Sequence, residues 1–520
     1  MDSRFAQIQD DRRVRQAKRL SSVTPTSLLM RTAWILLAIA CLTSTTSAGT
    51  TLQQIPTVLH VHSTWSTGTL SLDDLVARCR KLGIGAVFLS ENHLQSFEYG
   101  LFPLRGLLRY RIQFPSLAKN GTASFLRAVA EINAKQKDVL IIPGAEIVPH
   151  YYWTGSLFQN TLTMYNAQKN ILALGLSRPA DYDEMPATGN YRAGRWGVET
   201  IWLLSPAVLI IPGIILLRTK RRQVVSTRSF VARRERRLIR PGLVCLGLAI
   251  VLLINNYPFR RAPQSMYDDK AGLRPHQEVI DFISSRGGVA VWSMPEAIDY
   301  QTYNLWKFRA TIRTDKYPSD LLNTDRFAAF GGLYEDTRPF VDAGQGWDRL
   351  LRDSIDGFRT AAWAVAESGY HYEGHAGKRL GEIQTVLLAD RKDPATLLSA
   401  LRSGRAYSLQ RNEKEGLVLE RFQVVVPGND PVEAGSEVVL RSVARPELHL
   451  AVASSTGQPV AIEVKVIRSG TVVHAIQGKT PFLFQWTDTS LPPKSRHFYR
   501  LIIRGSGHEI LSNPIFVKAT

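Results

Sequence analysis

The sequence predicts an α/β barrel that is interrupted by a transmembrane helical hairpin and followed by an all-β sandwich. Three observations indicate this fold class. A strand–helix–strand pattern over residues 56–90 has polar, ligand-type residues at the ends of both strands. Two apolar segments flank a strongly basic stretch near the middle of the chain. From about residue 410, short segments of alternating polarity are separated by Pro, Gly, Asp and Ser turns.

The net charge of +19 over 520 residues is concentrated in two segments. Residues 1–32 carry a net charge of +4 and residues 218–240 a net charge of +9, and both segments adjoin apolar stretches. This distribution is typical of the cytoplasmic flanks of a membrane protein. It predicts the lipid bilayer as a partner and argues against nucleic acid, and it indicates no particular protein partner.

Residues 1–49 combine a basic lead, the short apolar segment 33–42 and the small residues Thr46, Ser47 and Ala48. Ten apolar residues are too few to span a bilayer comfortably, so the segment predicts a signal peptide, with an uncleaved anchor as the alternative.

The second and third apolar segments, 201–217 and 243–254, predict a transmembrane hairpin over residues 199–258 with its basic loop in the cytoplasm. The alternative, two buried core helices, would require acidic partners for that loop, and none cluster nearby in the sequence.

This topology places the rest of the chain on the periplasmic side of the cytoplasmic membrane. The barrel then consists of residues 50–198 and 259–408, on either side of the hairpin, and residues 409–520 form the β-sandwich. Within the barrel, helices are expected over residues 71–83, 123–136 and 275–285, and an amphipathic helix within 332–359.

A candidate metal site begins in the first strand. Val58 and Leu59 favour an extended backbone, in which His60 and His62 project from the same face. Neutral imidazole is the commonest side-chain ligand of zinc and related metals. The next strand ends in Glu91, Asn92 and His93, so the pattern predicts a metal site at the C-terminal ends of the strands.

These motifs resemble the PHP (polymerase and histidinol phosphatase) metallo-phosphoesterases, whose first motif reads H-x-H-S-x-x-S-D-G. Five residues match it: His60, His62, Ser63, Ser66 and Gly68. A later strand ends in Pro143-Gly144-Ala145-Glu146, which matches the family's P-G-x-E, and His371 matches the histidine of the family's G-S-D-A-H. Elsewhere the chain departs from the family. Asn92 and Met294 stand at histidine positions, Gly369 stands at an aspartate position, and a one-residue shift would let His93 replace the first of these imidazoles.

The resemblance implies a distorted TIM-like PHP barrel that holds one to three divalent metal ions (Zn, Mn or Fe) and hydrolyses phosphate esters or related esters. The implied metal ligands are His60, His62, Glu91, His93, Glu146, His371 and His375. Arg338 and Arg359 are candidates to bind a small anionic substrate, because guanidinium binds phosphate in a bidentate manner. For either residue alone, an ordinary surface salt bridge is the favoured interpretation.

Asn and Met are poor ligands for zinc or manganese, so the departures leave three interpretations open. The chain is an active hydrolase with a reduced metal set, a catalytically degenerate barrel kept for ligand binding, or a structural module of a membrane assembly.

Overall fold

The computed structural model describes most of the chain after its N-terminal segment, namely residues 52–194, 197–256, 262–305, 307–336, 338–413, 415–441 and 444–520. The predicted signal peptide or anchor, residues 1–49, lies outside the described residues. The described part has a mixed α/β architecture.

The first strand–helix–strand unit forms as predicted. Strand β1 (Gln53–Val61) pairs in parallel with β2 (Ala86–Leu89), and α3 (Leu72–Lys81) connects them. The Ser71 hydroxyl caps α3 by accepting a hydrogen bond from the Asp74 backbone N–H. The predicted apolar stripe of the helix, which includes Leu75, is buried against the core.

Two sheets are joined where two strands of the first sheet continue, after a single residue, into strands of the second. The first sheet contains the neighbours β18 (Ile383–Ala389), β1, β2 and β6 (Leu140–Ile142). The second sheet has the order β17 (Trp363–Ala366), β16 (Ala329–Leu333), β13 (Val289–Trp292), β10 (Ile171–Leu174), β7 (Gly144–Ile147) and β3 (Glu91–Asn92). Only Ser90 separates β2 from β3, and only Pro143 separates β6 from β7.

The segment that follows β17 returns to β1. The backbone N–H groups of Ser368 and Tyr370 donate hydrogen bonds to the carbonyls of Leu59 and His60. This connectivity supports the predicted barrel, which itself stays a prediction. Two strands depart from an all-parallel arrangement: β18 runs antiparallel to β1, and β10 runs antiparallel to both β7 and β13. For β10 the reason is that β8 (Tyr152–Thr154) and β9 (Leu162–Tyr165), rather than a crossover helix, connect β7 to β10.

The three predicted barrel helices beyond α3 are present, and they cover the strands with their apolar faces. They are α5 (Thr122–Lys135), α10 (Arg274–Ser285) and α12 (Gly346–Ile355), and α13 (Pro394–Ser403) follows β18. Further short helices and strands of this region are α4 (Leu117–Asn120), α6 (Pro179–Asp183), α11 (Pro318–Leu322), β4 (Ser96–Gly100), β5 (Arg109–Gln113), β14 (Asp299–Leu305) and β15 (Phe308–Thr314).

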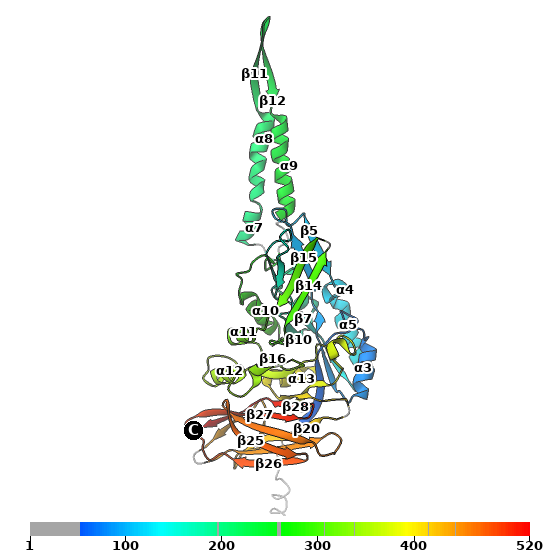
Figure 1. The fold of residues 1–520 in the computed structure, drawn as a ribbon, viewed down its shortest axis with the longest axis vertical. Helices are drawn as coiled ribbons and strands as arrows, with labels where there is room; N and C mark the ends of the chain where they lie inside the picture. The colour runs from blue at the N-terminus through cyan, green and yellow to red at the C-terminus, as the bar shows by residue number, and fades with distance from the viewer. Residues whose placement is uncertain are drawn as a thin grey trace, which may run out of the picture. The chain divides into compact units, whose positions relative to one another are not determined.

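The predicted hairpin consists of two helical segments that lie side by side (Figure 1). α7 (Val198–Leu203) and α8 (Ile210–Arg218) form the first, and α9 (Ile239–Asn256) forms the second. Both segments are long and apolar enough to cross a membrane, and 11% of the apolar stretch of each is buried. The basic segment between them is a β-hairpin rather than an irregular loop, because β11 (Lys220–Thr227) and β12 (Phe230–Arg237) pair in register across a two-residue turn.

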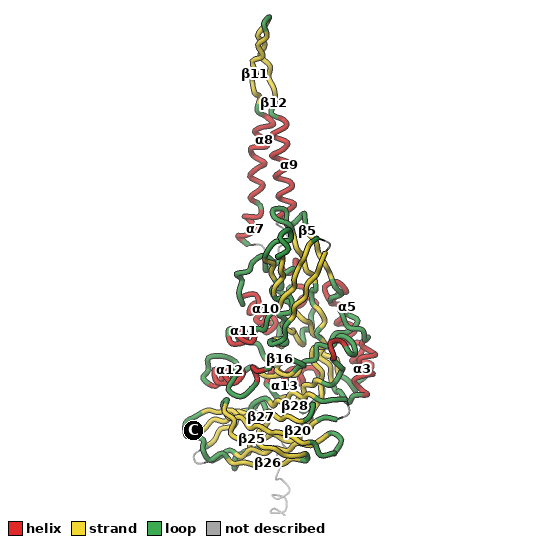
Figure 2. The backbone as a smooth tube through the Cα atoms, viewed as in Figure 1, coloured by secondary structure: helices red, strands yellow, loops and turns green. Residues whose placement is uncertain are grey.

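The C-terminal region contains the predicted short strands (Figure 2). One sheet comprises β21 (Val432–Glu433), β20 (Leu417–Val425), β23 (Glu447–Ser454) and β26 (Phe482–Thr487). The facing strands are β22 (Glu437–Leu440), β24 (Ala461–Arg468), β25 (Thr471–Lys479), β27 (Arg496–Gly505), β28 (His508–Ser512) and β29 (Ile515–Ala519). Apolar side chains of both sets form one buried core.

The C-terminal strands are continuous with the sheet of β1. Strand β19 (Ala406–Gln410) pairs with both β18 and β28, so the predicted domain boundary at residue 408 falls inside a strand. A fully buried ion pair also joins the two regions, because Arg500 of β27 donates two hydrogen bonds, of 2.6 and 2.7 Å, to the Asp348 carboxylate of α12.

Candidate metal centre

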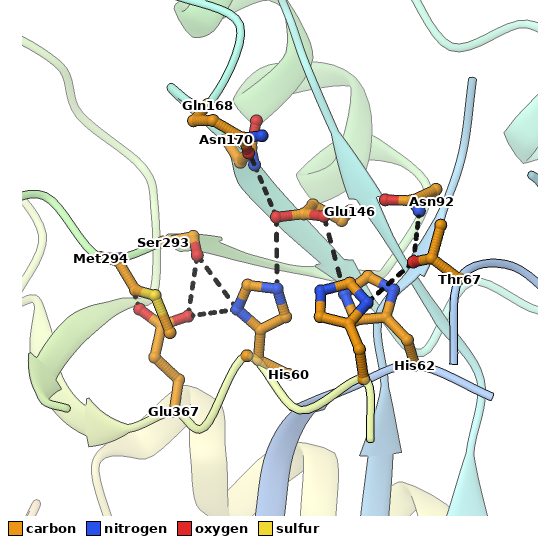
Figure 3. Close-up of polar contacts among 12 residues, drawn as sticks. His60, His62, Thr67, Asn92, Glu146, Gln168, Asn170, Ser293, Met294 and Glu367 are labelled. Carbon is orange, nitrogen blue, oxygen red and sulfur yellow. Dashed lines mark hydrogen bonds and ion pairs between the residues drawn. The ribbon is translucent and has the colours of Figure 1, made fainter. Parts of the chain in front are cut away.

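Three side chains from two distant strands meet at one point (Figure 3). His60 and His62 come from the end of β1, and Glu146 comes from β7. The Nε2 atom of His60 lies 3.2 Å from one Glu146 oxygen, and the Nε2 atom of His62 lies 3.7 Å from the other. One ligand atom from each residue lies within 4.8 Å of the other two, which makes the trio the candidate metal group of the described residues.

His60 reaches this point through a local break in the strand. Its φ is +61°, and the pairing of β1 with β2 shifts register between Leu59 and Val61. Simple alternation along a strand therefore does not explain why the two imidazoles converge, although the sequence pattern led to the same pair.

The orientation of the His60 ring is fixed by Glu367, which follows β17. Glu367 Oε2 lies 2.9 Å from His60 Nδ1 and accepts a hydrogen bond from the Ser293 hydroxyl, also 2.9 Å long. Its other oxygen accepts from the backbone N–H of Met294. Gly331 makes room for this carboxylate, because a Cβ at that position would lie 1.7 Å from Glu367 Oε1. With its Nδ1–H directed to Glu367, His60 points its Nε2 atom at the centre, where a bound metal ion would take the place of the Nε2 proton.

The orientation of His62 is fixed by two hydroxyls and Glu91. His62 Nδ1 lies 3.2 Å from the Ser66 hydroxyl, which donates its own proton to Glu91. Ser66 therefore accepts the Nδ1–H of His62, and the Nε2 atom of His62 has no hydrogen-bond partner. The Ser63 hydroxyl and backbone N–H occupy the other Glu91 oxygen. The structure thus places Glu91 behind His62 and not in the trio, because both of its oxygens are engaged by the serines.

His371 lies directly on His62. The two rings stack with centroids 4.0 Å apart and planes 9° apart. His371 Nδ1 lies 2.8 Å from the Thr67 hydroxyl, which accepts a hydrogen bond from the Asn92 amide. The ring of His375 meets His371 edge-on at 5.1 Å. His371 therefore adjoins the trio at His62, and His375 adjoins His371, while the predicted role of both as metal ligands stays a prediction. Asn92 contacts the site through the Thr67 hydroxyl.

Opposite charges decide the protonation of His60 and Glu146, whereas burial decides that of His62. Burial lowers the pKa of His60 and raises that of Glu146, but the attraction between the two, with Glu367 adding to it at His60, outweighs burial. The net result is a His60 pKa raised to about 9 and a Glu146 pKa lowered to about 2. Burial, and then the neighbouring His371, lower the pKa of His62 well below 6.5, and burial lowers the pKa of His371 to about 4. His62 and His371 are therefore neutral at pH 7, the form in which imidazole binds metal.

Three other residues predicted for the site lie elsewhere. His93 Nε2–H donates to the Tyr182 carbonyl, 2.7 Å away, and burial lowers the pKa of that imidazole to about 4. Arg338 pairs with Glu509 at 2.5 Å, and Arg359 donates to the carbonyls of Leu321 and Thr324. Neither arginine lines the cavity beside the trio. Their guanidinium groups are instead used by contacts that hold distant parts of the fold together.

A cavity of about 260 Å³ opens beside the trio, and its lining includes all three substituted positions, Asn92, Met294 and Gly369. Two of them, Met294 and Gly369, lie against each other. A Cβ built on Gly369 would lie 2.8 Å from Met294 Cε and 2.7 Å from Lys378 Nζ. The thioether and the ammonium thus fill the space that a side chain at position 369 would need. Neither group is a ligand that zinc or manganese favours.

Several residues of the site were not nominated from the sequence. Asn170 donates a 2.5 Å hydrogen bond to Glu146 Oε1, and Glu367, Ser293 and Lys378 complete the surroundings. The only available signal was the position of Ser293 and Glu367 within the motif segments near residues 293 and 367. Nothing in the local sequence indicates which of these polar residues turns inward.

The donor set fits a divalent metal ion. Two imidazole nitrogens and a carboxylate are ligands that Zn²⁺, Mn²⁺ and Fe²⁺ accept, and each imidazole has its second nitrogen engaged by a supporting group. The unpartnered, buried Nε2 of His62 is the atom that most directly requires a partner at this point. The structure contains one such group of His, Cys, Asp and Glu among its described residues.

No protein-family model matches this chain, and a search of curated proteins finds no match. Two solved structures align with most of their own length. A two-domain protein from Bacteroides vulgatus that contains a predicted PHP-like metal-dependent phosphoesterase is 9% identical, with 88% of this chain and 91% of that chain covered and a TM-score of 0.33. A protein from Bifidobacterium adolescentis, assigned as a metal-dependent phosphoesterase, is 17% identical, with 62% and 89% covered and a TM-score of 0.24. The solved structures similar to this chain thus include PHP-like metal-dependent phosphoesterases.

Proposed function

We propose that this chain is a membrane-tethered, extracytoplasmic metal-dependent hydrolase of phosphate esters or related esters. The observation that carries the proposal is the convergence of His60, His62 and Glu146, with the Nε2 of His62 buried and unpartnered. We propose these three residues as metal ligands, with His371 completing the site from the face of His62.

A divalent metal ion bound there would supply a hydroxide at neutral pH and neutralise charge that develops on the transferred group. The protein's own residues prepare for this chemistry. Glu367 and Ser66 hold His60 and His62 with their Nε2 atoms toward the centre. Asn170 holds one oxygen of Glu146 in place by donating a hydrogen bond to it. The adjoining cavity gives a small ester access to these groups.

The membrane part of the proposal rests on the hairpin. The helical segments α7–α8 and α9 expose apolar side chains along their length, including Trp202, Ile211, Val244 and Ile250. Exposed apolar surface of this extent is stable in a bilayer and unfavourable in water. The basic strands β11 and β12 between them predict a cytoplasmic tip. A reporter inserted at the turn between β11 and β12 should score as cytoplasmic, and an extracytoplasmic score would contradict this topology.

Metal analysis of the purified protein tests the hydrolase. At least one equivalent of tightly bound Zn, Mn or Fe is expected, and it should be lost in a His60→Ala/His62→Ala double variant. The control is His474→Ala, since His474 contacts Phe484 and Trp486 in the β-sandwich region, far from the trio in the sheet order. Turnover of p-nitrophenyl phosphate or a p-nitrophenyl ester should disappear with the metal.

The second candidate function is a catalytically degenerate barrel that binds a ligand or acts as a scaffold at the membrane. The observation that favours it is the contact of the Met294 thioether and the Lys378 ammonium with Gly369. These two side chains fill one side of the site with groups that do not favour zinc. Less than one equivalent of metal, together with no turnover of either ester, would favour this alternative.

A further inference from the structure

The cavity beside the trio has an unbalanced polar lining. It includes Glu146 and Asp299, and Glu367 lies directly behind His60. Among the described residues that line it, Lys378 is the only lysine or arginine. An anionic substrate entering this cavity would meet carboxylates, so a positive charge is needed to hold it.

Lys378 is held at the cavity by its backbone, not by its ammonium group. The carbonyl of Lys378 accepts a hydrogen bond from the N–H of Gly374, and its N–H donates to the carbonyl of His375. Gly374 and Gly377 have φ values of +83° and +79°, which lets the chain make this tight turn. The turn directs Lys378 to Gly369, where its Nζ lies 2.7 Å from the position of a Cβ.

The ammonium group itself makes only long contacts. Lys378 Nζ lies 3.4 Å from the Gly369 carbonyl and 3.9 Å from Glu335 Oε2, which is beyond hydrogen-bond distance. Its side chain is 16% exposed. An ammonium with three donors, partly buried and with one weak hydrogen bond, has donors left for a ligand.

We infer that Lys378 binds a phosphoryl oxygen of the substrate and supplies, beside the metal trio, the positive charge that a further metal ion would otherwise bring. The inference deepens the proposed function and rests on it. It assigns the substrate class as phosphate monoesters rather than neutral esters. It also gives the anion-binding role to Lys378, in place of Arg338 and Arg359, whose guanidinium groups are engaged elsewhere.

The test compares charge removal with charge retention. Lys378→Met keeps most of the side-chain volume and removes the charge, Lys378→Gln is a second neutral variant, and Lys378→Arg keeps the charge. Lys465→Met is the matched control, because Lys465 is also partly buried and lies 3.7 Å from a carboxylate, that of Glu463, but on a strand of the β-sandwich region. Binding of inorganic phosphate and of Zn²⁺ to the full chain in detergent is measured by calorimetry, with and without the other ligand.

The neutral variants should bind phosphate roughly 10- to 100-fold more weakly than the wild type, as expected for the loss of a charge-assisted hydrogen bond. Lys378→Arg and Lys465→Met should stay within about threefold, and the Zn²⁺ affinity of every variant should also stay within about threefold. Phosphate binding by folded Lys378→Met and Lys378→Gln at wild-type strength, or no phosphate binding by the wild type, would overturn the inference. Failure of the wild type to bind Zn²⁺ would instead defeat the proposed function, and the phosphate titration without Zn²⁺ would still decide the role of Lys378.

Discussion

Replacing Glu367 by Gln tests how the centre is held. This carboxylate accepts three hydrogen bonds, from His60 Nδ1, the Ser293 hydroxyl and the Met294 backbone N–H. An amide has only one acceptor oxygen, so it cannot serve donors on both sides. If the oxygen faces His60, the amide NH₂ opposes the Met294 N–H. If the side chain is flipped, the NH₂ faces His60 and forces the tautomer in which Nε2 carries the proton and cannot bind metal.

Either orientation leaves at least one buried donor without an acceptor, which costs about 1–3 kcal/mol. Supporting groups of this kind contribute roughly 10- to 100-fold to metal affinity. We therefore expect Glu367→Gln to weaken Zn²⁺ binding about 10- to 100-fold and to lower the free energy of unfolding by about 1–3 kcal/mol. The assays are competition with a chromophoric chelator and denaturant unfolding.

Glu296→Gln is the matched control. Glu296 is also a buried glutamate that accepts from a backbone N–H, that of Phe340, but it does not contact the trio. It should change the stability of the protein without changing Zn²⁺ affinity by more than about threefold. Wild-type Zn²⁺ affinity in Glu367→Gln would refute the reasoning, because the centre would then not depend on the orientation of His60.

Three further predictions concern single contacts. Ser66→Ala should weaken Zn²⁺ binding about tenfold because His62 loses its supporting acceptor. Ser63→Ala should not, because the Ser63 hydroxyl contacts Glu91 and the Trp65 backbone N–H but not the His62 ring; equal chelator-competition curves for the two variants would contradict this. Arg500→Met should lower the free energy of unfolding by about 3–5 kcal/mol because it leaves the Asp348 charge buried, and a second change, Asp348→Leu, should restore most of that loss in denaturant unfolding. His276 is buried with neither ring nitrogen partnered, and burial lowers its pKa well below 6.5. Below pH 6.5 the unfolded chain binds a proton at His276 that the folded chain does not, so the free energy of unfolding falls as the pH falls. His276→Phe should reduce this dependence of the free energy of unfolding on pH by up to about 1.4 kcal/mol per pH unit, as measured by denaturant unfolding at several pH values.

Much of the fold was predictable because its signals are local. The Ser71 cap, the apolar stripe of α3 and the helices α5, α10 and α12 follow from residue spacing over one or two turns. The apolar character of α8 and α9 is likewise visible in the sequence alone. The continuity of the C-terminal strands with the sheet of β1 was not predictable, because it depends on the pairing of β19 with β28 across about a hundred residues.

By itself, the sequence determined which residues could bind a metal: a pair of histidines at the end of a strand and a glutamate after a later strand. Tertiary structure decided how each candidate is used. It joined His60 to Glu367, 307 residues away, turned Glu91 toward Ser63 and Ser66, and drew Arg338 and Arg359 into contacts elsewhere. The physical reason is that helix and strand patterns are set by neighbours along the chain, whereas the partner of a buried polar group is set by which strands pair and where a glycine such as Gly331 leaves space.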